Sequence, residues 1–264
     1  MITNNPFAEL SEFIHPFFMQ TFVLIMIFLV ILGTVLDMIH KKNVHYFFQN
    51  AKKSKKQAKK ILSLSDKSSV VFKTIASEVL TTSELGLGKR RFAHLLGMYG
   101  SIIFWVSSVI LIFCYPYSLL NTPFIYPALW HIGAIMTCVG GYWFWFFLRV
   151  DVSSEAYPWY RIIQADLFVL SLVITSTMAL LWSLSQTLDF NNLEVIFLLF
   201  YILSNIILFG GVYWSKFAHM FYKPGAAIQR NLAEADGSRD NLPEPSDKPK
   251  KFGLGIKREA PKHY

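Results

Sequence analysis

Five apolar runs, each about 20 residues long, constrain this chain more than any other feature of its sequence. They cover residues 16–39, 92–115, 127–148, 162–183 and 193–214. A helix of about 20 residues rises about 30 Å, which matches the hydrocarbon core of a bilayer. Because 53% of the 264 residues are hydrophobic, too little polar surface would remain to cover a soluble domain. The sequence predicts an all-α integral membrane bundle of five transmembrane helices.

The distribution of Lys and Arg predicts the direction in which the helices cross. Neither residue occurs at 1–15, 116–126 or 184–192, whereas 40–91 holds thirteen of the 25 and 215–264 holds ten. The remaining two flank the short loop between the third and fourth runs, so all 25 fall on one side of the bundle. The positive-inside rule assigns this side to the cytoplasm. We expect a multi-pass protein of the inner (cytoplasmic) membrane, with the N-terminus outside and the C-terminus cytoplasmic.

The chain divides by composition into a membrane domain at 1–224, with a basic cytoplasmic loop at 40–91, and a polar cytoplasmic tail at 225–264. The tail contains several prolines and few large aliphatic residues, so it cannot bury a core of its own. Apolar residues at helical spacing over 68–80 predict an amphipathic helix that binds lipid or a partner protein. The lysine run at 52–60 directly follows a span, which favours anionic lipid over nucleic acid as its contact.

Several classes of function are excluded or disfavoured. The two cysteines, Cys114 and Cys138, lie in apolar runs without metal-ligand spacing, which excludes a Cys-ligated iron–sulfur cluster in this chain. No Gly-rich strand-to-helix motif for a flavin or nucleotide is present. The first apolar run follows Glu9 and Glu12 and is too long for a signal-peptide core, so we expect no cleavable signal. The chain itself therefore carries no predicted catalytic centre.

The tripeptide Phe-Ala-His occurs twice, at 92–94 and at 217–219. His94 opens the second span and His219 follows the fifth, so both are expected near the cytoplasmic face. Two neutral imidazoles on facing helices are the usual axial ligands of a b-type haem. Three nearby cations could bind the haem propionates, namely Arg90, Arg91 and Lys216. His40 is a reserve ligand. The alternative is that these histidines reach lipid headgroups.

The haem hypothesis makes a structural demand on the fifth span. That helix would have to continue past residue 214 to about Tyr222, where Pro224 would stop it. Gly97 and Gly100 lie one and two turns after His94 and would leave room either for a flat macrocycle or for a close neighbouring helix.

Other polar residues could serve a quinone. Asp166, near the start of the fourth span, could accept a proton from a quinol, or it could form a structural ion pair with Arg149 or Arg161. Near the outer face, His131 and His15 could mark a second cofactor or a quinone pocket, or could anchor the chain to headgroups.

These features resemble two families of membrane subunit. Five spans, an Arg-Arg-x-x-His at 90–94 and a histidine after the fifth span resemble the cytochrome b subunits of respiratory nitrate reductase, heterodisulfide reductase and the quinone-interacting membrane-bound oxidoreductase. The segments 214–220, 223–225, 237–243 and 252–261 are similar to the membrane anchor of dissimilatory adenylylsulfate reductase. The first resemblance covers the five spans and the second mostly the last 50 residues.

The resemblance implies a non-catalytic subunit that exchanges electrons between the quinone pool and the flavin and iron–sulfur subunits of cytoplasmic adenylylsulfate reductase. His94 and His219 then take the inner-haem positions. The second haem pair of the nitrate reductase type falls on Phe104 and Tyr201, which are not usual haem ligands. A single inner haem is therefore expected. The alternative functions are a haem-free anchor that only docks a soluble redox complex, or a small transporter.

Overall fold

The computed structural model describes residues 2–86, 88–149, 160–215 and 217–238, and all its regular elements are helices. Internal contacts divide the chain into two compact units. Unit 1 contains Met1–His40 and Arg90–His219, and unit 2 contains Lys41–Lys89 and Met220–Tyr264. The sequence-based division at residue 224 separated a membrane domain from a tail, whereas unit 2 combines the basic loop with the chain that follows the last span.

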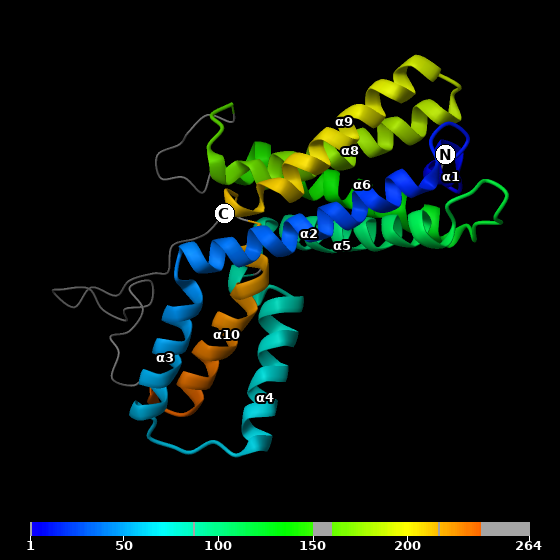
Figure 1. Cartoon of the computed structure of the whole chain (residues 1–264). Helices are drawn as coiled ribbons and strands as arrows, with labels where there is room; N and C mark the ends of the chain where they lie inside the picture. Colours follow the sequence, from blue (N-terminus) through cyan, green and yellow to red (C-terminus); the bar gives the residue numbers. More distant parts are fainter. Residues whose placement is uncertain (1, 87, 150–159, 216, 239–264) are drawn as a thin grey trace. The chain divides into compact units, whose positions relative to one another are not determined.

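Unit 1 holds the five predicted spans (Figure 1). Its elements are α1 (Pro6–Leu10), α2 (Pro16–His40), α5 (Lys89–Cys114), α6 (Ile125–Trp143) with the π-helical turn η3 (Phe144–Leu148), η4 (Gln164–Asp166), α8 (Leu167–Thr187), α9 (Asn191–Gly210) and η5 (Gly211–Tyr213). Five of these stretches are long and apolar enough to cross a membrane. The predicted five-span all-α fold is confirmed, and the span ends agree with the prediction to within a few residues.

The outer surface of unit 1 is apolar, as a surface in contact with lipid must be. Only 22–44% of the residues in the most hydrophobic window of each span are buried. Large aliphatic side chains therefore remain outside, among them Leu24, Ile31 and Leu199, each more than half exposed. In water such a belt would be strongly unfavourable, and in a bilayer it is required. The chain is a multi-pass membrane protein.

Glycines allow the closest approach within the bundle, between α5 and α6. A Cβ added at Gly100 would lie 2.6 Å from the backbone nitrogen of Thr137, and one at Gly140 would lie 2.6 Å from the carbonyl oxygen of Ala93. Gly133 makes an equally close approach to the backbone of Phe104. Small residues at such a seam let two helix backbones pack in direct contact, which is a common source of stability between helices in lipid.

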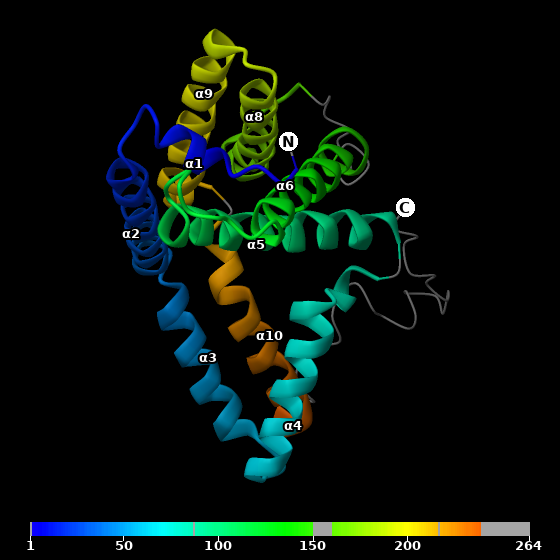
Figure 2. The same cartoon turned by 90° about the vertical axis from the view of Figure 1, so that its right-hand side faces the viewer.

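The described part of unit 2, residues 41–86, 88–89 and 220–238, consists of three helices. They are α3 (Asn43–Gln57), α4 (Leu64–Thr74) with the π-helical extension η1 (Ile75–Leu80), and α10 (His219–Ala235), with the short turn η2 (Ser83–Leu85). In Figures 1 and 2, α10 lies between α3 and α4. The predicted amphipathic helix at 68–80 thus exists but begins earlier, at Leu64.

The condition that the haem hypothesis set for the last part of the chain is not met. The fifth span does not continue to Tyr222, because α9 ends at Gly210 and a new helix begins at His219. Pro224 does not stop a helix but lies inside α10. The part of the predicted polar tail up to Ala235 is helical, and α10 packs on α4, where Asn231 Nδ2 donates to Thr74 Oγ1 at 2.8 Å. The segment 239–264 lies outside the described residues.

Candidate functional site

Of the two predicted haem-ligating histidines, one lies within a membrane span and the other at the start of the helix that follows the last span. His94 is in the second turn of α5, with an exposed side chain, and Arg90 and Arg91 in the preceding turn are half-buried. His219 is the first residue of α10 rather than a continuation of the fifth span. Its side chain and the whole of Lys216 lie outside what the structure describes. His40, the reserve ligand, ends α2 with its exposed ring 5.8 Å from the ring of Tyr213.

Phe217 connects the segment before His219 to the helix that carries His94. Its ring is 2% exposed and lies 6.1 Å from the ring of Trp105 on α5, 5.1 Å from Phe168 on α8 and 6.1 Å from Phe209 on α9. Trp105 follows His94 by eleven residues, or three helical turns, so both project from the same face of α5. Phe217 was not among the predicted site residues, although the repeated Phe-Ala-His tripeptide contains it.

The donors at this end of unit 1 fit a haem in their chemistry. The described side chains supply one imidazole and two guanidinium groups, from His94, Arg90 and Arg91, and a b-type haem uses such groups for its iron and its propionates. A Cβ built at Gly97, one turn after His94, meets nothing within 4 Å, so that side of α5 is open. Gly100 differs from Gly97, because the space beside it is filled by residues of α6, against which α5 packs. Of the two roles considered for these glycines, Gly100 has the packing role.

Asp37, an ionisable residue that was not among the predicted site residues, lies inside unit 1. Asp37, in the last turn of α2, is fully buried. One turn earlier, Gly33 brings α2 against η5, because a Cβ on Gly33 would lie 2.9 Å from Cβ of Val212. A carboxyl group inside a span is costly and is usually retained for a function. The signal was visible in the sequence as an acidic residue near the end of an otherwise apolar run.

Asp166 forms the structural ion pair that was one of its two predicted roles. Its carboxylate accepts hydrogen bonds from Arg149 Nε at 3.2 Å and Arg149 Nη2 at 2.5 Å, and from the backbone N–H of Ile163 at 3.0 Å. The Arg149 guanidinium also lies 4.3 Å from the ring centre of Trp145. Both carboxylate oxygens of Asp166 are engaged by the same guanidinium group, which is the geometry of a structural ion pair.

The two outer histidines have local hydrogen-bonding roles. His131 is fully buried, with Nδ1 2.7 Å from the carbonyl oxygen of Pro127 and Nε2 2.8 Å from Oγ of Ser183. A carbonyl only accepts, so Nδ1 carries the proton and Nε2 accepts from the serine hydroxyl. Neither nitrogen is open to iron. His15 is exposed, and its Nδ1 accepts from the backbone N–H of Phe17 at the start of α2.

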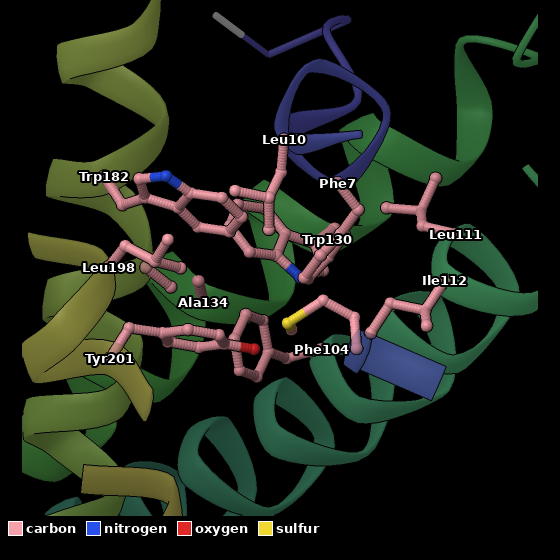
Figure 3. Packing of buried hydrophobic residues seen from close by; sticks show 12 residues of the cluster. Phe7, Leu10, Phe104, Leu111, Ile112, Trp130, Ala134, Trp182, Leu198 and Tyr201 are labelled. Carbon is pink, nitrogen blue, oxygen red and sulfur yellow. The ribbon is translucent and has the colours of Figure 1, made fainter. Parts of the chain in front are cut away.

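Packed aromatic residues fill the positions where the nitrate reductase type has its second haem pair. Phe104 is 1% exposed and Tyr201 is 5% exposed. Phe104 lies 5.2 Å from the ring of Trp130, and Tyr201 stacks at 5.7 Å on Trp182. Figure 3 shows these rings together in the core of unit 1, with Phe7 from α1 among them. A haem at this place would have to displace that core, so the residues present do not fit a second haem.

Helix α1 covers the aromatic core of unit 1 around Trp130 and Trp182. Phe7 lies 5.8 Å from the ring of Trp130 and 5.4 Å from that of Trp182. The carbonyl oxygen of Pro6 accepts a hydrogen bond from Gln186 Nε2 at 3.1 Å, and Asn5 Nδ2 donates to the carbonyl oxygen of Tyr115 at 2.8 Å. Such a short apolar helix gave no sequence signal, because it contains one turn and no periodicity can be measured over it.

Among the described residues, no group of three or more His, Cys, Asp and Glu side chains could hold a metal ion. Cys114 and Cys138 are both free, the first exposed and the second half-buried. The candidate site is therefore the His94 end of unit 1, defined by His94, Arg90, Arg91 and the segment 217–219. Comparison with known proteins yields no match to any protein-family model, curated protein or solved structure.

Proposed function

We propose that this chain is the membrane anchor and electron-transfer subunit of a redox complex, linking the quinone pool to cytoplasmic adenylylsulfate reductase through one b-type haem at the His94 end of unit 1. The observation that carries the proposal is the attachment of the second Phe-Ala-His segment to the His94-bearing helix, through the packing of Phe217 on Trp105. The resemblance of the last 50 residues to adenylylsulfate reductase anchors supplies the partner.

In this proposal each residue has a limited task. His94 and His219 hold the haem, and Arg90 and Arg91 bind its propionates. The haem supplies one-electron transfer between a quinol and the partner. Phe217, buried between α5, α8 and α9, keeps water out of the bundle above the site. The flavin and iron–sulfur chemistry of sulfite and AMP belongs to the partner subunits, so this chain performs no catalysis.

The experiment compares His94→Ala with His15→Ala in the purified full-length chain. Both histidines have exposed side chains, so neither substitution opens a cavity. We expect the reduced-minus-oxidised b-type absorption to vanish in His94→Ala and in His219→Ala and to persist in His15→Ala. A wild-type spectrum in His94→Ala would overturn the ligand assignment. Replacing His40 tests the reserve ligand in the same assay.

A second candidate is a haem-free anchor that only docks the soluble complex. It is favoured by the end of α9 at Gly210, which removes the continuous helix that a His219 ligand was expected to use, and by the exposure of the His94 side chain. A pyridine haemochrome assay on the wild-type chain separates the two candidates. About one haem per chain supports the first, whereas retention of the reductase subunits without haem supports the second.

A further inference from the structure

Two aliphatic side chains stand fully in solvent at one end of unit 2. Ile61 is 96% exposed and Leu64 is 85% exposed, and both belong to the connection between α3 and the start of α4. We call this pair the apolar tip. A single exposed aliphatic residue is ordinary, but two neighbours exposed to this degree in a membrane protein's polar unit indicate a contact surface. Phe72, two turns further along α4, is 74% exposed and extends the surface.

The apolar tip is held in one conformation by its neighbours. Leu62, between the two exposed residues, points inward and is only 8% exposed. Ser63 caps α4, because its hydroxyl accepts from the backbone N–H of Asp66 at 3.1 Å while the Asp66 carboxylate accepts from the Ser63 N–H at 3.2 Å. The backbone N–H groups of Lys59 and Lys60 both donate to the carbonyl oxygen of Asp236. A surface fixed in advance loses little entropy on binding.

Lysines predominate among the charges around the apolar tip, although Asp236, whose carbonyl oxygen bonds to Lys59 and Lys60, brings an acidic side chain to the same end of unit 2. Residues 41–70 contain nine lysines, and Asp66, which is engaged in the α4 cap, is their one acidic residue. Lys59, Lys60 and Lys67 are exposed on either side of Ile61 and Leu64. An apolar centre with a cationic rim matches an apolar socket with an acidic rim, since complementary rim charges guide association while buried apolar anchors hold it.

The apolar tip also lies at a defined end of unit 2. Helices α3 and α10 run parallel, since Gln229 Nε2 bonds to the carbonyl oxygen of Phe47 and Ser54 Oγ lies 3.0 Å from Ser238 Oγ. Helix α4 runs antiparallel to them. All three covalent connections to the membrane-spanning unit, at residues 40/41, 89/90 and 219/220, therefore leave from the opposite end of a helix about 22 Å long.

We propose that the apolar tip is the docking point for a soluble, acidic partner protein, which inserts Ile61 and Leu64 into an apolar socket ringed by carboxylates. This inference rests on the proposed function, under which adenylylsulfate reductase is that partner. Anionic lipid would recognise the same charges, but the three connections to the membrane-spanning unit leave unit 2 at its other end. A soluble partner is therefore the occupant.

The test uses the full-length chain in phosphatidylcholine nanodiscs and purified adenylylsulfate reductase. Ile61→Asp/Leu64→Asp is compared with Leu119→Asp, which changes an equally exposed leucine (95%) in the α5–α6 loop of unit 1. The double variant should bind at least about 30-fold more weakly, as expected when two anchor residues are lost, while Leu119→Asp binds like the wild type. Neither variant removes a buried side chain, so thermal unfolding of both should match the wild type.

The outcomes separate this inference from the proposed function. If the wild-type chain does not bind the reductase, the proposed function fails and the docking inference fails with it. If the wild type binds and the double variant binds equally well, only the docking inference is overturned.

A lipid contact is tested by labelling Ile61→Cys with a water-soluble maleimide, in a Cys114→Ser/Cys138→Ser background and without reductase. We expect equal labelling rates in phosphatidylcholine and phosphatidylglycerol nanodiscs. A rate about tenfold lower in phosphatidylglycerol would assign the apolar tip to the lipid surface and overturn the proposal.

Discussion

Polar side chains buried inside the bundle form hydrogen bonds to other residues of the bundle, and His131 is an example. His131 was a candidate for a cofactor or quinone, yet both of its ring nitrogens are engaged, one by the carbonyl of Pro127 and one by the hydroxyl of Ser183. The sequence showed a histidine in a span but not the serine 52 positions later that faces it. Partners on different helices are a product of packing, which residue spacing along one run does not predict.

Replacing Ser183 should destabilise the bundle by leaving His131 Nε2 without its donor. We expect Ser183→Ala to lower the free energy of unfolding in micelles by about 1 kcal/mol. Ser176→Ala is the matched control, because this equally buried serine of α8 only donates to the carbonyl oxygen of Leu172 in its own helix. Equal effects of the two substitutions would mean that the His131–Ser183 bond contributes nothing.

Glu9 gives the docking of α1 a dependence on pH. Partial burial, and then the neighbouring charges of Glu194 and Glu12, raise the pKa of the Glu9 carboxyl above its ordinary value. The docked state therefore prefers the protonated form, so docking is strongest below the ordinary carboxyl pKa and weakens as pH rises through the raised pKa. Glu9→Gln should slow amide exchange in α1 at neutral pH. A smaller effect is expected for Glu12→Gln, which changes an exposed carboxyl.

At the scale of the helices, the α5–α6 seam sets the strictest requirement. An alanine at Gly140 would place its Cβ 2.6 Å from both the carbonyl oxygen of Ala93 and the backbone nitrogen of Gly97, and backbone atoms cannot move aside as a side chain can. We expect Gly140→Ala to cost about 1–3 kcal/mol of stability in micelles. Gly97→Ala, on the opposite helix of the same seam, meets nothing and should be neutral or slightly stabilising. A neutral Gly140→Ala would show that the two helices can separate without loss.

The helices also show which parts of the fold a sequence determines. The five spans were predictable because continuous apolar length has one physical meaning in a bilayer. The fifth span ends close to residue 214 as predicted, but the extension to Tyr222 that the haem hypothesis required, with Pro224 as its stop signal, is absent. The relevant signal was the Gly210-Gly211 pair, since glycine commonly ends a helix, and η5 follows it directly. Pro224 comes early in α10, where only one backbone hydrogen bond is lost.

The candidate site was predictable only in part. The repeated Phe-Ala-His tripeptide predicted a site at the segments 92–94 and 217–219, and this stays a prediction. Asp166 formed one of its two predicted ion pairs. The packing of Phe217 against Trp105 was not predictable, because that contact joins residues more than one hundred positions apart. Nor did composition reveal α10, whose polar residues found partners on α4 instead of remaining in solvent.

For the molecule as a whole, the cation distribution predicts an orientation across the membrane, and this prediction can be tested directly. In a Cys114→Ser/Cys138→Ser background, Leu119→Cys and Ile61→Cys offer two fully exposed positions, one in each unit. A membrane-impermeant maleimide should label Leu119→Cys in intact cells and Ile61→Cys only after lysis, because the positive-inside rule places the lysine-rich unit in the cytoplasm. The reverse pattern would invert the topology and remove the proposed cytoplasmic partner.

The composition of unit 2 has a consequence for biosynthesis. Two of its helices are translated before the second span, but α10 emerges from the ribosome only after the last one. The carbonyl of Asp236, which fixes Lys59 and Lys60, is thus supplied by nearly the final described residues. A chain arrested during insertion would lack these two hydrogen bonds to Asp236. Only a chain in which all five spans have been made can therefore present the apolar tip in its final conformation to another protein.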